Sequence, residues 1–463
     1  MREISSQNNK YQKIKLRGNR MVKVGLFNES FFPQLDGVAV AVENYAKIIN
    51  KIYGESFIIV PHIKQRVCES FPYEVWEYPS ANINIADQYS IGIPISAALR
   101  KKFLETPMDI VHSHCPFTSG VFAQRVATRK NVPHITTFHS KYKDDINKRL
   151  KLKMEMPGEL VAKYIVAFYN RCDYVWAVNH STLETLRSYG YKGAVFVMPN
   201  GCDMPRTYRD EETLGKVFKK YNFAEEAPLL LFVGRHTWTK NIDIIIKSLG
   251  ALARNGVKFN MLFVGDGEDK CAMEKMVESQ GISHMVVFSG KVIDRESLKE
   301  IYQSSDLFLF PSVYDNAPLV VREAAACGCA SVLIEGSNSA EEAIHGVNAF
   351  LTKETVEDFA LTVKFALESG RLAEVGDCAR RDMYISWDDV LIKVVEEYEK
   401  IKNEWVSKKQ AKRNAKEEKL ELKKIDLEKE YKLNASETIK RQLKKVKKNA
   451  NKKSEKNNHT TLD

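Results

Sequence analysis

Long apolar runs are missing from this chain of 463 residues. No stretch approaches the roughly 18 apolar residues that a membrane-spanning helix needs. The amino terminus also lacks the apolar core of a signal peptide. We therefore expect a cytoplasmic protein that is either soluble or attached peripherally to the inner face of the plasma membrane.

Cysteine pairs with a recognisable spacing are missing as well. The eight cysteines are scattered singly except for Cys327 and Cys329, and they form neither a metal-ligand motif nor a compact disulfide framework. The acidic pairs Asp144-Asp145 and Asp388-Asp389 lack the strand-end context of a metal site. We expect buried or idle thiols in a reducing cytoplasm and no bound metal.

An excess of positive charge is missing from most of the chain, although the net charge is +10. Residues 408–463 hold 19 of the 70 basic and 9 of the 60 acidic residues, which leaves 51 of each in the rest of the chain. The body is therefore neutral and the tail is basic. Charge alone would permit the tail to bind nucleic acid, but nucleic acid is not the expected partner.

Apolar segments alternate with helical patterns in both halves of the chain. Strands are predicted in the first half at 22–27, 57–60, 109–112 and 135–139, with a helix at 120–128. This alternation is typical of a doubly wound parallel sheet. A second α/β series starts at Leu229, and the length suits two domains.

The segment Pro311 to Gly328 follows a short apolar strand, Leu307 to Phe310, and leads into an alanine-rich helix. Ligands bind at loops that leave the carboxyl ends of parallel strands, and Pro318 is expected as the first helical residue. The helix amino terminus would attract an anion. Asp315 and Glu323 bracket this turn with seven residues between them. They could accept hydrogen bonds from sugar hydroxyls, or they could simply cap the helix.

The apolar strand that starts at Leu229 is followed by a turn at Gly234, by Arg235 and by Lys240, before the next helix. Two cations at the carboxyl end of a strand can neutralise a diphosphate leaving group, whose charge grows as its bond to a sugar breaks. Surface Arg-Lys pairs are common, so the pair alone does not identify a site.

Three histidines and one glycine lie near predicted strand ends in the first half. His112, His114 and His139 follow two of the strands, where a histidine is more often a polar cap than a catalyst. Gly37 follows the first strand and could let the backbone approach a ligand, although turn glycines are common.

Together these segments resemble the retaining glycosyltransferases of the GT-B fold, family 4. In that family two glutamates frame seven residues, and Asp315 stands in the place of the first one. Arg235 and Lys240 match the family's arginine-lysine pair, and Asn241 replaces the glycine that usually follows. The threonine-histidine motif at His139 also resembles the family. The resemblance extends over about residues 22–405.

The resemblance implies two Rossmann-like domains that face each other across a cleft, and transfer of a hexose from a nucleotide sugar, expected to be a UDP-sugar, with retention. Arg235 and Lys240 would hold the departing diphosphate, Glu323 the ribose, Asp315 the sugar hydroxyls, and His139 the reacting sugar from the opposite domain. The acceptor would be a lipid or a glycan, and no metal would be needed. The donor would also contact Gly37, Gly234, Lys291, Val292, Pro318, Leu319 and Val320.

The resemblance indicates the boundaries of the two domains and the return helix, and composition indicates the extension and the tail at the two ends. We expect a disordered extension at 1–20, an acceptor-side domain at 21–205 and a nucleotide-sugar-binding domain at 206–386. A helix at 387–407 would return to the first domain, and the basic tail at 408–463 would be a charged helix or disordered.

A basic cluster interleaved with apolar residues follows His139. It is either solvated surface or an amphipathic segment that lies on anionic lipid beside the acceptor cleft. Segments in this position resemble the membrane-facing part of diacylglycerol glucosyltransferases. The cluster consists of Lys141, Lys143, Lys148, Arg149, Lys151 and Lys153.

The tail has the same two interpretations, because Ile439, Leu443 and Val446 recur at helical spacing among lysines. Two other functions remain open for the whole chain. One is a glycosyltransferase that builds a cell-surface polysaccharide. The other is a binding or scaffold protein that keeps the fold without its chemistry.

Overall fold

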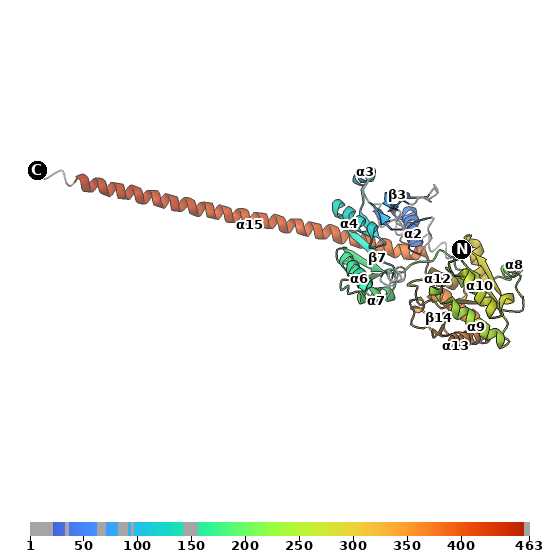
Figure 1. Ribbon diagram of the computed structural model, residues 1–463. Coiled ribbons are helices and arrows are strands. Elements are labelled where there is room, and N and C mark those ends of the chain that lie inside the picture. Colours follow the sequence, from blue (N-terminus) through green and yellow to red (C-terminus); the bar gives the residue numbers. More distant parts are fainter. Residues whose placement is uncertain are drawn as a thin grey trace. The chain divides into compact units, whose positions relative to one another are not determined.

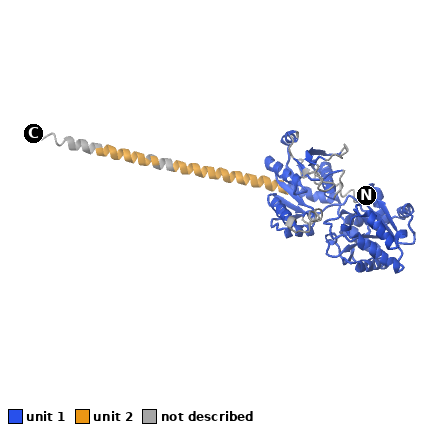
Figure 2. Cartoon of the chain, in the orientation of Figure 1, with its two compact units in different colours: residues 1–399 blue, residues 400–463 orange. Residues whose placement is uncertain are grey.

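The computed structural model describes residues 22–32, 37–62, 71–81, 91–93, 97–140, 142 and 156–457. The chain divides into two compact units, residues 1–399 and residues 400–463, which Figure 2 colours separately. Unit 1 contains two parallel sheets, and the described residues of unit 2 belong to a helix.

The first sheet has the order β3-β2-β1-β6-β7-β8-β9, and its neighbouring strands are parallel. Its strands are β1 (Val22–Phe27), β2 (Gly54–Pro61), β3 (Glu74–Tyr78), β6 (Ile110–Ser113), β7 (His134–Phe138), β8 (Tyr174–Ala177) and β9 (Phe196–Val197). Its helices are α2 (Gly37–Ile52), α3 (Ala97–Glu105), α4 (Thr118–Lys130), α6 (Met156–Tyr169) and α7 (His180–Ser188), and β4 (Ser80–Ala81) pairs separately with β5 (Ile91–Gly92). The strand order reverses between β1 and β6, which is where ligands bind in such sheets.

The second sheet has the order β12-β11-β10-β13-β14-β15, again with parallel neighbours. Its strands are β10 (Leu229–Val233), β11 (Asn260–Val264), β12 (Val286–Gly290), β13 (Leu307–Phe310), β14 (Ala330–Ile334) and β15 (Phe350–Thr352). Here the order reverses between β10 and β13, the two strands whose following loops carry the predicted donor residues.

Helices cover the second sheet in two groups. One group contains α9 (Ile242–Arg254), which contacts both α10 (Lys270–Ser279) and α13 (Val356–Glu368). The other contains α8 (Glu211–Tyr221), α11 (Arg295–Ser304), α12 (Leu319–Ala326) and α14 (Leu372–Asp382). Figure 1 shows several of these helices packed around β14. Short 3₁₀ turns occur at η1 (Trp238–Lys240), η2 (Ser283–Met285) and η3 (Asn338–Ala340).

The central strands form the core because they are almost entirely apolar and are buried on both faces. All residues of β10, β11, β13 and β14 are buried, as expected for strands of a parallel sheet covered by helices. The rings of Phe232 and Phe310 stack 6.1 Å apart across β10 and β13. This packing fixes the loops at the carboxyl ends of the two strands.

The last helix, α15 (Trp387–Asn457), is longer than the predicted return helix. In unit 1, Tyr398 donates or accepts a 2.6 Å hydrogen bond at His112 Nδ1 and stacks on Trp176, so this part of α15 packs on the first sheet. The helix continues through 407/408 without a break, and the division between compact units falls at 399/400 instead. Of the two forms considered for the tail, the structure has the helix. None of the helices in the described part of the chain is long and apolar enough to cross a membrane.

Candidate active site

Lys240 and Asp315 meet at the carboxyl ends of two neighbouring strands. Lys240 Nζ donates to Asp315 Oδ1 in a close ion pair, and the two side chains are 17% and 20% exposed. Ser312 Oγ donates to the other carboxylate oxygen at 2.5 Å. The pair forms because β10 and β13 are adjacent, so their following loops lie side by side. It places a cation beside an acid at the switch point of the second sheet.

Asn241 explains how the chain turns after Lys240. Its φ of 55° lies in the left-handed region, which asparagine tolerates better than most residues. Its side chain donates to Pro311 O at 3.1 Å and to Glu354 Oε1 at 2.7 Å. Asparagine can therefore replace the glycine of the family at this position and also tie the turn to the loop after β13.

The backbone at Gly234 packs directly against a second loop, which contains Gly265 and Gly267. Gly234 has a φ of 158°, and a Cβ added to Gly265 would lie 1.9 Å from Gly234 O. A Cβ added to Gly267 would lie 2.3 Å from the carbonyl oxygen of His236. This contact leaves Arg235 exposed at the turn, and within the described residues Arg235 forms no ion pair.

Glu323 lies on α12 and is held by two neighbours from α11. Arg295 Nη2 donates to Glu323 Oε1 at 2.8 Å, and Tyr302 Oη donates to Oε2 at 3.1 Å. Arg295 also forms a close ion pair with Asp203. Burial raises the pKa of Glu323 above its ordinary value, and the Arg295 guanidinium opposes that rise. Glu323 is thus a positioned carboxyl group rather than a freely solvated one.

The amino terminus of α12 differs slightly from the prediction. Pro318 is the N-cap residue, not the first helical residue, because its ψ of 119° is extended; the helix begins at Leu319. No side chain caps this end of α12. The backbone N–H groups of its first turn therefore face the loop that holds Asp315. Neither Asp315 nor Glu323 caps the helix.

His139 comes from the first domain and contacts the loop that holds Asp315. It follows β7, and its carbonyl oxygen accepts a 3.1 Å hydrogen bond from Asn316 Nδ2, in the loop after β13. Its ring Nε2 lies 3.0 Å from His114 Nδ1. Burial lowers the pKa of His139 to about 3, so its imidazole is neutral at physiological pH. His114 is buried as well and orients this ring.

His112 has a structural role instead. Its Nε2 lies 2.7 Å from Thr137 Oγ1 and its Nδ1 lies 2.6 Å from Tyr398 Oη. Burial lowers its pKa well below the ordinary value. Both ring nitrogens are used inside the protein, so His112 anchors α15 to the first sheet.

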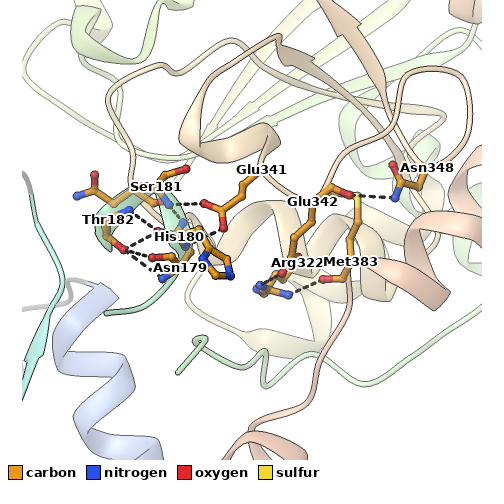
Figure 3. A network of polar contacts seen from close by, with 10 residues as sticks. Asn179, His180, Ser181, Thr182, Arg322, Glu341, Glu342, Asn348 and Met383 are labelled. Atoms are coloured by element: carbon orange, nitrogen blue, oxygen red, sulfur yellow. Dashed lines mark hydrogen bonds and ion pairs between the residues drawn. The ribbon is translucent and has the colours of Figure 1, made fainter. Parts of the chain in front are cut away.

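A second set of polar contacts joins segments of the two sheets, as Figure 3 shows. The Glu341 carboxylate accepts hydrogen bonds from the backbone N–H groups of His180 at 2.8 Å and Ser181 at 2.7 Å, at the start of α7. Asn179 Nδ2 donates to Asn316 O at 2.7 Å. These bonds tie the loops after β13 and β14 to the start of α7.

The positions of the remaining predicted residues do not by themselves connect them to the site. Gly37 is the exposed first residue of α2, and among the described residues a Cβ there would meet nothing within 4 Å. Lys291 and Val292 follow β12, in the loop that leads to Arg295. The six cations of the cluster after His139 lie outside the described residues: Lys141, Lys143, Lys148, Arg149, Lys151 and Lys153.

Sequence reasoning missed Asp203, Arg295, Tyr302 and Asn316. One signal for Arg295 was available: it is the first residue of α11, where the helix dipole disfavours a cation. A cation in that position indicates a specific acidic partner. The other three residues gave no such signal, because polar residues at turns and tyrosines on helices are ordinary. Among the described residues, no three His, Cys, Asp or Glu side chains are grouped so that they could hold a metal ion.

Comparison with known proteins identifies the family. A family model described as glycosyltransferase family 4 matches residues 35–206, and one described as glycosyl transferases group 1 matches residues 215–381. The chain belongs to the family 4 glycosyltransferases of the GT-B fold. It is therefore a transferase enzyme whose two parallel sheets are the two Rossmann-like domains of that fold.

Two curated relatives illustrate the range of this glycosyltransferase family. An alpha-monoglucosyldiacylglycerol synthase of Streptococcus pneumoniae is 23% identical over 66% of this chain and 70% of the relative. A GDP-mannose-dependent alpha-mannosyltransferase of Corynebacterium glutamicum is 22% identical over 75% of this chain and 80% of the relative.

Solved glycosyltransferase structures share the fold. The Anabaena protein HepE, solved in complex with UDP and glucose, superposes with a TM-score of 0.64 at 14% identity, covering 82% of this chain and 99% of that chain. Sucrose-phosphate synthase of Thermosynechococcus elongatus gives a TM-score of 0.67 at 15% identity, with 82% and 99% covered.

Proposed function

We propose that this glycosyltransferase moves a hexose from a UDP-sugar to a membrane lipid acceptor at the cytoplasmic face, with retention of the anomeric configuration. The observation that supports this most is the meeting of Lys240 with Asp315 beside the uncapped start of α12, with His139 bonded to the same loop. Cation, acid, free N–H groups and neutral imidazole are what a sugar diphosphate requires around its reacting bond.

The diphosphate would bind between the two loops. Arg235 is exposed and forms no ion pair within the described residues, so it is available to a phosphate. Lys240 would exchange its bond to Asp315 for a bond to a phosphate oxygen, or would donate to both groups at once. The N–H groups of Leu319 and Val320 would donate to the same anion. Asp315 would then accept from hydroxyls of the sugar.

The nucleoside would lie toward β12. Glu323 has both oxygens engaged by Arg295 and Tyr302, but each carboxylate oxygen has a second lone pair. Those lone pairs would accept hydrogen bonds from the ribose hydroxyls. Backbone groups of Lys291 and Val292 would contact the base. The UDP preference is supported by UDP-bound neighbours such as HepE, while one relative is named as GDP-mannose-dependent.

The chemical step would be a front-face displacement. The bond between the anomeric carbon and the diphosphate oxygen breaks as the acceptor oxygen bonds to the same face of that carbon. The acceptor hydroxyl proton passes to a phosphate oxygen of the leaving UDP. Arg235 and Lys240 stabilise the growing negative charge, and the neutral His139 ring would hydrogen-bond the reacting sugar. In this mechanism the side-chain cations balance the charge of the leaving group, so no metal is needed.

A lipid acceptor is supported by the diacylglycerol-directed name of the S. pneumoniae relative and of a second relative from Acholeplasma laidlawii. A cell-surface polysaccharide is the alternative acceptor, because the acceptor differs among the relatives: one is named as an N-acetyl-alpha-D-glucosaminyl L-malate synthase. The alternative of a scaffold without catalysis is disfavoured, because Lys240, Asp315 and Glu323 keep specific partners in the site.

The test is a transfer assay with the purified full chain. Each assay offers one radiolabelled donor with diacylglycerol vesicles or with soluble glycans, with and without chelator. The donors are UDP-glucose, UDP-galactose, UDP-N-acetylglucosamine and GDP-mannose. We expect transfer from one UDP-sugar to the lipid, unchanged by chelator. Transfer only to a glycan would replace the lipid acceptor, and loss of transfer with chelator would refute the metal-free mechanism.

A further inference from the structure

The distal part of α15, in unit 2, exposes a narrow apolar face. Ile439, Leu443 and Val446 are 57%, 57% and 65% exposed. At 3.6 residues per turn these three side chains fall within about 60° of one another on the helix surface. Such a stripe of large aliphatic residues in water is unfavourable unless something covers it.

The same segment is strongly basic. No acidic residue occurs between 438 and 454, and the cations around the apolar face are Lys440, Arg441, Lys444, Lys445, Lys447 and Lys448. Arg441 pairs with Glu437 at 3.9 Å, and in the described part of unit 2 the five lysines have no ion pair. In contrast, residues 411–438 contain eight basic and seven acidic residues.

We propose that residues 439–448 bind an anionic lipid surface, with Ile439, Leu443 and Val446 inserted at the headgroup boundary. A basic amphipathic helix lies in this way in the membrane interface, because the apolar face leaves water while the cations meet lipid phosphates. Long lysine side chains can reach upward to the headgroups from either side of the apolar face.

A second copy of this chain fits the segment less well. A stable pair of helices needs apolar residues at heptad positions over about three to four heptads. Here the apolar residues occupy about two turns. Two identical segments of this charge would also repel each other.

Nucleic acid also fits less well. Its phosphates would satisfy the lysines, but a duplex surface offers no apolar layer for Ile439, Leu443 and Val446. The three exposed aliphatic side chains therefore favour lipid as the occupant.

This attachment surface goes beyond the proposed function. It rests on the proposed function only in that the acceptor is taken to lie in the membrane. Lipid binding is measured without donor, so its failure and the failure of sugar transfer are separate results.

The experiment is vesicle sedimentation of the full chain with phosphatidylcholine alone or mixed with phosphatidylglycerol. One variant changes the distal face, I439S/L443S/V446S. The matched control is L420S/L422S/L427S, which removes three apolar residues that are 54%, 56% and 65% exposed on the same helix. Circular dichroism verifies that each variant keeps its helix content.

We expect at least tenfold tighter binding to the anionic vesicles, weakening as salt rises. The distal variant should lose at least tenfold in affinity, and the control should stay within about twofold. The proposal would be overturned by an equal loss of affinity in both variants, or by binding that does not depend on lipid charge. It would also be overturned if the protein bound duplex RNA more tightly than lipid and the distal variant retained that binding. A salt-sensitive dimer seen by sedimentation in the absence of lipid, and abolished by the distal variant, would assign the face to a second copy instead.

Discussion

At the scale of single residues, the ion pair between Lys240 and Asp315 is the feature on which the proposed chemistry depends. A glutamate at position 315 would extend further into the site. The shorter aspartate is instead fixed by Ser312 three residues earlier. The substitution thus keeps an acid in the site while changing which sugar hydroxyl it can reach.

Removing the cation should be costly. We expect Lys240→Ala to lower kcat by a hundredfold or more, because one preorganised charge at a transition-state oxygen is typically worth about 3–4 kcal/mol. Initial rates with saturating donor measure this. Lys258→Ala, an exposed lysine of the same domain, is the control and should leave kcat unchanged. Near-normal turnover in Lys240→Ala would show that the diphosphate is held elsewhere.

Arg295 should act through Glu323. We expect Arg295→Met to weaken UDP binding about tenfold and to reduce the preference for UDP over 2′-deoxy-UDP, because the carboxylate would lose its fixed orientation. Calorimetric titration of both ligands measures this preference. A variant that weakens both ligands equally would indicate a merely structural role for Arg295. Arg254→Met, on the surface of the same domain, serves as the control.

At the scale of elements, the turn from η1 into α9 permits a test of backbone strain alone. Asn241→Gly and Asn241→Ala lose the same two side-chain hydrogen bonds, but alanine is strained at a φ of 55°. We expect the alanine variant to be less stable than the glycine variant by about 1 kcal/mol. Urea denaturation measures the difference, and equal stabilities would mean that the turn relaxes.

The elements that could be predicted from the sequence are those whose signal is local. The first strand at 22–27 and the strand at 307–310 were predicted with their observed bounds, since a short, mainly apolar run between turns has few other interpretations. The resemblance to the family assigned Lys240 and Asp315 to one site, because each matches a family motif that follows a predicted strand. Neither inference needs a contact between distant residues.

The remainder depends on long-range contacts. Arg295 reaches Glu323 across 28 residues and Asn316 reaches His139 across 177 residues, and no local pattern encodes either bond. The continuity of α15 was also open in the sequence, because a charged segment without an apolar period is compatible with helix or disorder. Pro318 was placed one residue too far into the helix for a similar reason, since proline suits both positions.

At the scale of the whole molecule, buried histidines should make stability depend on pH. Burial lowers the pKa of His134 and His139 to about 3 and of His236 to about 4. The unfolded chain takes up these protons near pH 6.5 and the folded chain only below those values. The contribution of these histidines to stability should therefore be constant above pH 7 and should fall below pH 6.5, by about 1.4 kcal/mol per pH unit for each histidine.

His236 offers a test of that cause, because both of its ring nitrogens are buried and have no hydrogen-bond partner in the part of the chain that the structure describes. We expect His236→Phe to flatten the fall of the unfolding temperature between pH 7 and pH 5, whereas His284→Gln, at an exposed histidine, should not. An unchanged pH profile in His236→Phe would exclude this residue as a contributor.

The central claim is that the meeting of Lys240, Asp315 and His139 forms a retaining transferase site for a nucleotide sugar. The most direct measurement is proton NMR of the glycosylated product made from a UDP-α-hexose by the full chain. The account predicts an α-anomeric proton in the product, which Lys240→Ala forms at least a hundredfold more slowly than the wild type. A β-linked product, or the same product yield from Lys240→Ala, would contradict it.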